Sequence, residues 1–347
     1  MAEPRVVAPA AAIFGLSGPR LDARERAFFR AANPLGFILF ARNCVDEAQV
    51  RALICEIKDC LGRDDVPILI DQEGGRVQRL KPPRWRAAPA GARFAAAAVH
   101  SEDDAVEAAW LNARLLADEL AELGITVDCA PVLDVPVPGA HDVIGDRAYG
   151  TTPEQVALLG RAVCAGLLAG GVLPVLKHVP GHGRTGVDSH AALPVVDVPR
   201  ELLQRTDFAP FRALNDMPWA MTAHVVYSAI DPEAPATTSA RVVGEVVRGW
   251  IGFDGVLVSD DLCMKALAGT PAERAEAAFA AGVDLVLHCN GAMAEMEAIA
   301  AVCPPVGDDT RRRLARGEEM RRAASSAGFD RGWALARVDA LLGGVVA

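Results

Sequence analysis

The chain has 347 residues, of which 51% are hydrophobic and 23% charged, and its formal net charge at pH 7 is −10. This length fits one large α/β domain, and the hydrophobic half of the chain can form a sizeable core. The negative charge would repel the phosphate backbone of a nucleic acid, and no uninterrupted apolar run reaches the roughly 20 residues of a membrane-spanning helix. We therefore expect neither a nucleic-acid nor a membrane partner, and we take the chain to be a monomer.

The eight cysteines are dispersed along the chain, and most of them lie in apolar segments. This pattern in a large chain indicates reduced, buried thiols rather than a disulfide framework. No CxxC pair occurs, which argues against a thiolate zinc site. The first residues include Glu3 and lack the basic segment of a secretion signal, so we expect a cytoplasmic protein.

Eight short apolar runs, rich in β-branched residues, recur along the chain. They span residues 11–16, 36–40, 66–70, 125–132, 172–177, 219–225, 255–260 and 284–289. Amphipathic stretches between them predict helices at 21–32, 46–62, 103–124, 152–171, 200–216, 240–252 and 270–282. Apolar strands that alternate with helices predict a parallel sheet, and eight of them favour an α/β fold with a single (β/α)8 TIM-type barrel; an open doubly wound sheet is the alternative. We expect one domain over 1–347, with a C-terminal helical tail at about 308–347 packed outside the barrel.

Polar side chains follow nearly every predicted strand. In a (β/α)8 barrel the working residues come from the carboxyl ends of the strands. Placing a titratable group next to a buried strand costs free energy unless the group is paired or has a function in binding or catalysis. Near the ends of the third to eighth runs, or just past them, the chain places Asp71, Glu73, Asp128, Asp134, Lys177, His178, His224, Asp260, Asp261 and His288. Their convergence on one rim predicts an active site there.

The loop after the third predicted strand carries Asp71 with Arg76 and Arg79 nearby. In isolation, such a pattern is typical of a surface salt-bridge set. At the barrel rim, however, a carboxylate can accept two vicinal sugar hydroxyls and a guanidinium can donate in a fixed fork. We therefore interpret this loop as part of a sugar-binding site.

The segment KHVPGHGRTGVDSH, residues 177–190, holds three of the seven histidines. A metal site would use His178, His182 and His190, but proline and glycine interrupt any regular ligand spacing. A structural role is the second interpretation, and we keep it for His182. The third rests on Asp188 and His190: residues two apart in an extended segment point the same way, so the carboxylate can orient the imidazole.

This third interpretation joins the His190–Asp188 pair to Asp260. Retaining glycosidases need one group that attacks the anomeric carbon and another that first protonates the leaving oxygen and then activates water. An imidazole, with an unperturbed pKa of about 6.5, suits both proton transfers near neutral pH. Asp261 follows Asp260 directly, and because side chains alternate along a strand we expect it to face the other way and to be structural.

Three stretches together resemble the bacterial β-N-acetylhexosaminidases of glycoside hydrolase family 3. They are DQEGGRVQRL (71–80), KHVPGHGRTGVDSH (177–190) and GFDGVLVSDDL (252–262), with GDRAY (145–149) as weaker support. The resemblance covers essentially the whole chain and departs at Cys263, where the family usually has serine or another small residue without a thiol. It implies that Asp260 is the nucleophile and that His190, oriented by Asp188, is the acid/base. It also implies that the N-acetylglucosamine ring is held by Asp71, Arg79, Arg147, Lys177 and His178.

The same resemblance implies an enzyme without metal or cofactor. Its substrate would be a muropeptide fragment, from which it removes non-reducing N-acetylglucosamine linked to 1,6-anhydro-N-acetylmuramic acid during cytoplasmic peptidoglycan recycling. Two other activities stay open, an N-acetylglucosaminide phosphorylase and a metal-dependent barrel hydrolase. Catalysis by the substrate's own acetamido group is a further possibility for the mechanism. A non-enzymatic sugar-binding barrel would predict a lost nucleophile or a broken loop, and the chain retains both.

Overall fold

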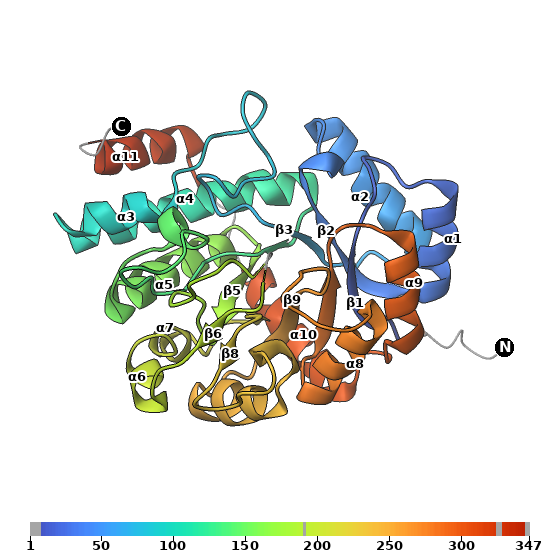
Figure 1. Cartoon of the computed structure of the whole chain (residues 1–347). Helices are drawn as coiled ribbons and strands as arrows, with labels where there is room; N and C mark the ends of the chain where they lie inside the picture. The colour runs from blue at the N-terminus through green and yellow to red at the C-terminus, as the bar shows by residue number, and fades with distance from the viewer. Residues whose placement is uncertain (1–7, 190–191, 324–327, 344–347) are drawn as a thin grey trace.

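The computed structural model describes residues 8–189, 192–323 and 328–343. Eight parallel strands close into a barrel in the order β1-β10-β9-β7-β5-β4-β3-β2, which confirms the predicted TIM-type fold (Figure 1). Each strand overlaps one of the eight predicted runs. The strands are β1 (Ala10–Gly15), β2 (Pro34–Leu39), β3 (Ile68–Ile70), β4 (Val127–Asp128), β5 (Leu173–Val179), β7 (Trp219–Thr222), β9 (Val256–Asp261) and β10 (Leu285–His288).

Helices surround the barrel, and their amphipathic faces supply the outer layer of the core. They are α1 (Ala23–Ala32), α2 (Glu47–Leu61), α3 (Gly91–Ala98), α4 (Glu102–Leu123), α5 (Pro153–Ala169), α6 (Arg200–Arg205), α7 (Ala209–Ala213), α8 (Pro271–Ala281), α9 (Met293–Val302), α10 (Asp308–Arg322) and α11 (Arg331–Leu342). A second, two-stranded sheet pairs β6 (Val195–Val196) with β8 (Val226–Tyr227). Within the described ranges no helix has the length and apolar character to cross a bilayer.

Helix boundaries follow the capping residues that the sequence indicates. Each cap side chain accepts a hydrogen bond from the backbone N–H three residues further on, which satisfies one of the unpaired donors of the first turn. The caps at four of the predicted helices are Asp22, Asp46, Thr152 and Thr270. Gly62, Gly124 and Gly282 end their helices with positive φ, where a side chain would be strained.

The prediction of one helix over 200–216 was wrong. The segment forms two short helices, α6 and α7, because Pro210 lies at the start of α7 and could not continue a helix from α6 without a lost hydrogen bond and a steric clash. The predicted helix at 240–252 is present at Val242–Trp250, but its hydrogen bonds follow the wider π pattern. Helices α3 and α9 were not predicted.

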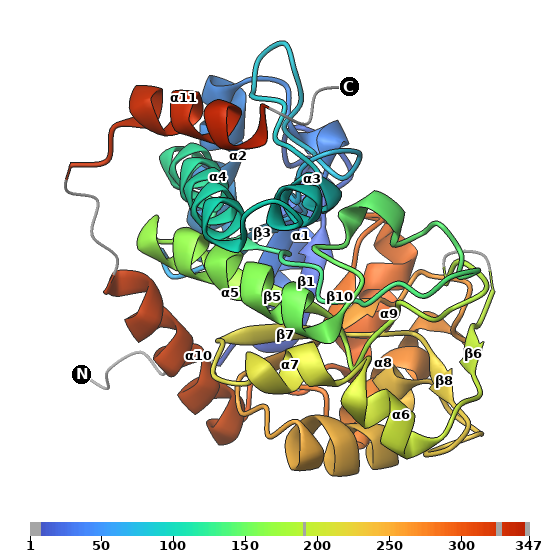
Figure 2. The same ribbon diagram turned by 90° about the vertical axis from the view of Figure 1, so that its left-hand side faces the viewer.

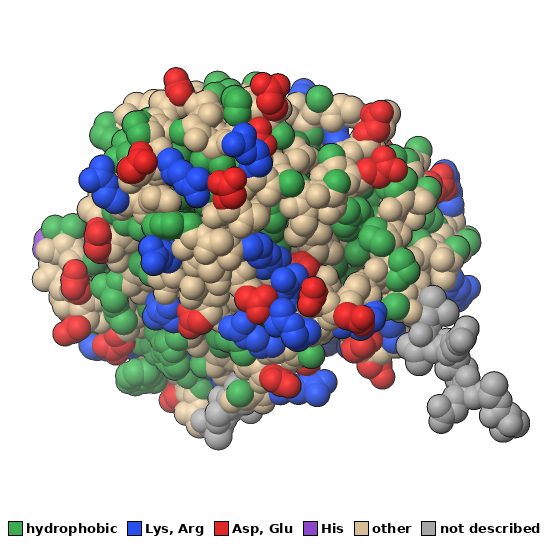
Figure 3. Space-filling model, turned by 90° about the horizontal axis from the view of Figure 1, so that it is seen from below, with side chains coloured by type: hydrophobic (Ala, Val, Ile, Leu, Met, Phe, Trp, Pro, Cys, Tyr) green, Lys and Arg blue, Asp and Glu red, His purple; other side chains and the backbone are tan. Residues whose placement is uncertain are grey.

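The C-terminal helices cover the outside of the barrel. Gly317 of α10 packs closely against Pro218 and Trp219, at the amino-terminal end of β7, and Arg313 pairs with Asp284 just before β10. Helix α11 lies along α4, apart from α10 (Figure 2). Acidic and basic side chains are interspersed on the face that Figure 3 shows. Because α10 covers the amino-terminal end of the strands, the opposite, carboxyl end is the one that stays open to solvent.

Candidate active site

A cavity of about 440 Å³ opens at the carboxyl ends of the barrel strands. It brings together every predicted site residue that the structure describes: Asp71, Arg79, Arg147, Lys177, His178, Asp188 and Asp260. His190 was predicted as the acid/base and lies outside the described residues. These residues come from β5 and β9 and from the loops that follow β3, β4 and β5, as the polar strand ends in the sequence predicted.

Asp71 lies at the centre of the cationic side of this cavity. Its two oxygens accept from different cations, Oδ2 from Arg79 Nη2 at 2.9 Å and Oδ1 from Lys177 Nζ at 2.8 Å. Burial would raise the pKa of Asp71, but the charges of Lys177 and Arg79 outweigh it and hold that pKa well below its usual range. Asp71 is therefore an anion, with lone pairs left for hydroxyl donors.

Glu73 is the second anion of the cluster, and sequence reasoning gave it no role. It accepts a two-pronged contact from Arg147, at 2.9 Å from Nε and 2.8 Å from Nη2, and it contacts Lys177 Nζ at 2.6 Å. Against the effect of burial, Lys177 and Arg147 lower the pKa of Glu73 to about 2. The sequence did contain a signal for this residue, because Glu73 is two residues from Asp71 and its side chain can point the same way.

The charges of this cluster do not cancel. Three cations, Arg79, Arg147 and Lys177, face two carboxylates, and Lys177 is almost fully buried with a side chain only 2% exposed. Burial alone would lower the pKa of Lys177, yet Asp71 and Glu73 raise it above its ordinary value. The cluster itself thus keeps one positive charge in excess, which suits hydroxyl oxygens, while Asp142, Asp188, Asp260 and Asp261 add carboxylates elsewhere on the cavity wall.

His178 is oriented by a buried carboxylate that sequence reasoning did not assign to it. Its Nδ1 lies 2.7 Å from Asp134 Oδ2, so Nδ1 carries the proton and Nε2 is left as the ring atom for a ligand. Asp134 is completely buried; burial would raise its pKa, but His178 lowers it below the usual value. The other oxygen of Asp134 accepts from the backbone N–H of His182, which ties the following loop to the same anion.

Two strand irregularities explain why neighbouring residues share the cavity. Lys177 pairs with Met221 and Val179 pairs with Thr222, so β5 has one more residue than β7 at this point. The extra residue interrupts the alternation of side chains, and both Lys177 and His178 line the cavity.

A similar shift in β9 overturns one expectation. Val258 and Asp261 pair with Leu285 and Leu287, which gives β9 three steps against two in β10. Asp260 and Asp261 therefore both line the cavity, instead of facing opposite sides. Their contacts still differ, because Asp261 Oδ1 accepts the backbone N–H groups of Cys263 and Cys289 and so holds two loops.

His224 contacts the backbone at the end of β9. It is fully buried, its Nε2 contacts the Asp261 carbonyl at 3.0 Å, and its Nδ1 contacts Thr237 Oγ1 at 2.7 Å. Burial lowers its pKa, so the ring is neutral at pH 7 and donates from Nε2 to the carbonyl. Asp260 is partly exposed, and its Oδ1 accepts the N–H of Asp261 at 2.8 Å. The neutral ring fixes the backbone that carries Asp260.

His182 lines the same cavity, and both of its ring nitrogens contact hydroxyl groups of its own loop. Its Nε2 contacts Ser189 Oγ at 3.1 Å and its Nδ1 contacts Thr185 Oγ1 at 2.9 Å. Burial, aided by the neighbouring His178, lowers its pKa to about 4. Among the described residues His178 and His182 are not part of any three-ligand group that could hold a metal ion. Asp188 lines the cavity on the same loop, close to the segment that contains His190.

Phe40 is a wall residue that sequence reasoning missed. It follows β2, lines the cavity, and lies under the guanidinium of Arg79, with Arg79 Cζ 5.0 Å from the ring centroid. This contact and the ion pair with Asp71 together fix the direction of Arg79. Phe40 itself is apolar, and the polar residues that follow it, Arg42 and Asn43, do not line the cavity, so the sequence carried no signal for this part of the site.

Comparisons with known proteins agree with this geometry. The Glycosyl hydrolase family 3 N terminal domain matches residues 17–308. A Beta-hexosaminidase of Alkalilimnicola ehrlichii is 43% identical over 284 residues, which are 80% of this chain and 80% of that protein. A Beta-hexosaminidase of Pseudomonas aeruginosa is 40% identical over 290 residues, 83% of this chain and 84% of that protein.

Solved structures give the same result. NagZ from Neisseria gonorrhoeae, in complex with N-trifluoroacetyl-D-glucosamine, is 34% identical and superposes with a TM-score of 0.85, covering 97% of this chain and 99% of that one. NagZ from the same organism has also been solved in complex with zinc ion. The sequence match, the barrel and the residues at its open end thus lead to one assignment. The chain belongs to glycosyl hydrolase family 3.

Proposed function

We propose that this enzyme is a retaining exo-β-N-acetylglucosaminidase. The observation that carries the proposal is the cavity at the open end of the barrel, where a partly exposed aspartate, Asp260, faces a cluster of hydroxyl-binding ions. Relatives of about 40% identity named Beta-hexosaminidase support a hexosaminide substrate, as does the relative solved with an N-acylated glucosamine. The motif resemblance supports a muropeptide as natural substrate, cleaved during peptidoglycan recycling in the cytoplasm.

The ion cluster fixes how the sugar ring would bind. Asp71 accepts hydrogen bonds from sugar hydroxyls, Arg79, Arg147 and Lys177 donate to sugar oxygens, and His178 Nε2 accepts from a hydroxyl. The contacts among these residues are made before the sugar arrives, at 2.6 to 2.9 Å, so little ordering is left for the binding step. Preformed, buried donors also interact more strongly than donors in water.

Catalysis would proceed in two steps at the anomeric carbon. Asp260 attacks this carbon and forms a glycosyl ester while His190 gives its proton to the leaving oxygen. His190 then takes a proton from water, which displaces Asp260 and regenerates the β anomer. Asp188 would support the imidazolium form of His190 between these steps, and Asp261 would hold the loops around the nucleophile.

A phosphorylase is the second candidate, and the one positive charge in excess within the ion cluster of Asp71 and Glu73 favours it. A neutral histidine base adds no anion beside the glycosyl ester, so the cations could admit phosphate in place of water. The products separate the two activities, since hydrolysis gives free N-acetylglucosamine and phosphorolysis gives the sugar 1-phosphate. We expect free sugar to dominate even at high phosphate.

The direct test uses the purified enzyme after treatment with a chelator. We expect it to cleave an aryl β-N-acetylglucosaminide and not the matched aryl β-glucoside, and to release N-acetylglucosamine from anhydromuropeptides. Proton NMR at early times should show the β anomer first. Initial release of the α anomer would contradict the covalent mechanism. Loss of activity on chelation, restored by metal, would favour the metal-dependent hydrolase.

A further inference from the structure

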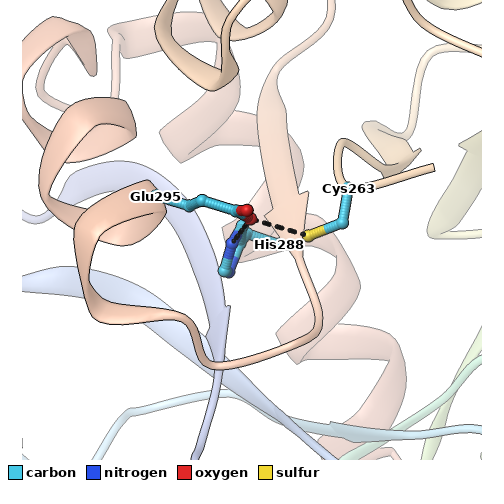
Figure 4. Close-up of side chains that lie close together, drawn as sticks. All are labelled: Cys263, His288 and Glu295. Carbon is cyan, nitrogen blue, oxygen red and sulfur yellow. Dashed lines mark hydrogen bonds and ion pairs between the residues drawn. The ribbon is translucent and has the colours of Figure 1, made fainter. Parts of the chain in front are cut away.

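Three potential metal ligands meet outside the cavity. Cys263 follows β9, His288 ends β10, and Glu295 lies in the first turn of α9 (Figure 4). None of the three lines the active-site cavity. Their donor atoms all lie within 4.8 Å of one another, and they are the only such group of three among the described residues.

The distances suit a tetrahedral ion. Glu295 Oε2 lies 2.9 Å from His288 Nε2 and 3.7 Å from Cys263 Sγ. Zinc bonds of about 2.0–2.3 Å at tetrahedral angles place neighbouring ligand atoms about 3.3–3.6 Å apart. These two distances lie within about half an ångström of that spacing, and the third pair, Cys263 Sγ and His288 Nε2, lies within 4.8 Å, so the side chains need to move by little more than about 1 Å to hold an ion between them.

We propose that Cys263 Sγ, His288 Nε2 and a Glu295 carboxylate oxygen bind one zinc ion. The fourth position would hold water, because the Glu295 side chain is 39% exposed and opens the cluster to solvent. Binding forms three metal–ligand bonds and releases the thiol proton to solvent. The histidine keeps a single proton, which moves from Nε2 to Nδ1.

The cluster fits a binding site better than it fits a purely structural contact. His288 is 1% exposed, and its Nδ1 has no hydrogen-bond partner among the described residues. The contact of Nε2 with Glu295 is thus the one hydrogen bond that this buried polar ring makes within the described part of the chain. An apolar residue at the end of β10 would avoid that cost. Asn290 already donates to Glu295 Oε2 at 2.9 Å, which orients the carboxylate as outer contacts do at metal sites.

A bound ion would brace the wall of the barrel beside the candidate nucleophile. Cys263 follows Asp261 by two residues, and Asp261 Oδ1 already accepts the N–H of Cys263. The ion would tie this loop to α9 through Glu295 and to β10 through His288. We therefore expect zinc to raise the midpoint of thermal unfolding, while the metal-free enzyme keeps its turnover.

Cobalt is the probe that identifies a thiolate ligand. Metal-free, full-length protein is titrated with cobalt(II) chloride, and the thiolate-to-cobalt charge-transfer absorption is recorded in the near ultraviolet. We expect this band to saturate at one equivalent in the wild type and to be displaced by zinc. Cys263→Ser and Glu295→Gln should lose it, or bind cobalt at least tenfold more weakly. Cys55→Ser, which removes an exposed thiol elsewhere, is the matched control and should keep it.

Serine is close to cysteine in size, so Cys263→Ser should fold, and circular dichroism checks this. Absence of the band in the folded wild type, or its persistence in Cys263→Ser, would overturn the proposal. Turnover of an aryl β-N-acetylglucosaminide by the chelated protein is measured separately. A failed zinc site would leave that turnover intact, and a failed glycosidase assignment would leave the cobalt band intact.

Discussion

Replacing Glu73 by glutamine removes one of the two anions that hold the cationic side of the cavity. The variant keeps the shape of the side chain but leaves Arg147 and Lys177 with Asp71 as the one remaining carboxylate partner in the cluster. Removing one member of a buried ion pair costs about 3–5 kcal/mol, because the remaining charge stays buried and uncompensated. We expect both stability and sugar binding to suffer.

The pKa of Glu73 gives an independent magnitude. The neighbouring cations hold it at about 2, against an ordinary value of 4.5. At about 1.4 kcal/mol for each pKa unit, the charged form contributes about 3 kcal/mol to folding. With about 2.1 cal/mol/K of unfolding entropy per residue, a loss of 3 kcal/mol lowers the unfolding midpoint of the 347-residue chain by about 4 °C.

The sign of the pH dependence follows from the lowered pKa. The contribution of Glu73 is fully present above pH 4.5 and is lost as the pH falls toward 2. Calorimetry at pH 7 should therefore show the 4 °C loss in Glu73→Gln, with a smaller difference from wild type at pH 3. Kinetics should show a fall in kcat/KM of at least about tenfold, for loss of one charged contact that orients the sugar donors.

Glu119→Gln is the matched control. Glu119 also pairs with an arginine, Arg86, in a partly buried contact, but it lies on α4, away from the cavity. Burial raises its pKa, so the folded state does not favour its charge, and Arg86 keeps its hydrogen bond to Asn112 Oδ1 at 2.7 Å; the variant should therefore change stability less than Glu73→Gln. If Glu73→Gln is as stable and as active as Glu119→Gln, the argument that a coupled ion cluster builds the sugar site is refuted.

Three further variants test separate parts of the account. In the wild type, the pKa of His182 is about 4 against an ordinary 6.5. The free energy of unfolding should therefore be highest above pH 6.5 and fall by about 3 kcal/mol as the pH drops to 4. Denaturant titrations of His182→Gln over the same pH range should not show this fall. Burial raises the pKa of Asp128 to about 7 from 3.8, so the folded state favours its neutral form. The wild type should lose stability as the pH rises from 4 to 8 and this carboxyl ionises. The free energy of unfolding of Asp128→Asn should therefore rise by up to about 4 kcal/mol relative to the wild type over that range. Equal pH dependence of either variant and the wild type would contradict these assignments. Asp260→Asn should lower kcat by about four orders of magnitude or more with an unchanged fold, measured by aryl glycoside hydrolysis and circular dichroism, and near-normal turnover would exclude it as nucleophile.

The barrel and the location of the site could be predicted because both depend on local signals. Eight apolar runs and their capped helices set the topology, and polar groups at the strand ends marked the open face. The split of the predicted helix at 200–216 was also encoded, in Pro210, but an apolar pattern on both sides masked it. Periodicity alone could not resolve this conflict.

What could not be predicted depends on strand register and on long-range pairing. The bulges in β5 and β9 place Lys177 beside His178, and Asp260 beside Asp261, on the same wall. Strand alternation in the sequence gives the opposite expectation. The partners Glu73–Arg147 and His178–Asp134 are separated by 74 and 44 residues, so no spacing rule reveals them.

The central claim is that Asp260 forms a covalent bond to the sugar. The most direct measurement incubates the chelated enzyme with an activated 2-deoxy-2-fluoro glycoside and locates the modified peptide by mass spectrometry. The account predicts one sugar adduct on Asp260 and loss of activity in proportion to its formation. An adduct on Asp188 or Asp261, or inhibition by a thiazoline mimic far stronger than any covalent trapping, would contradict it.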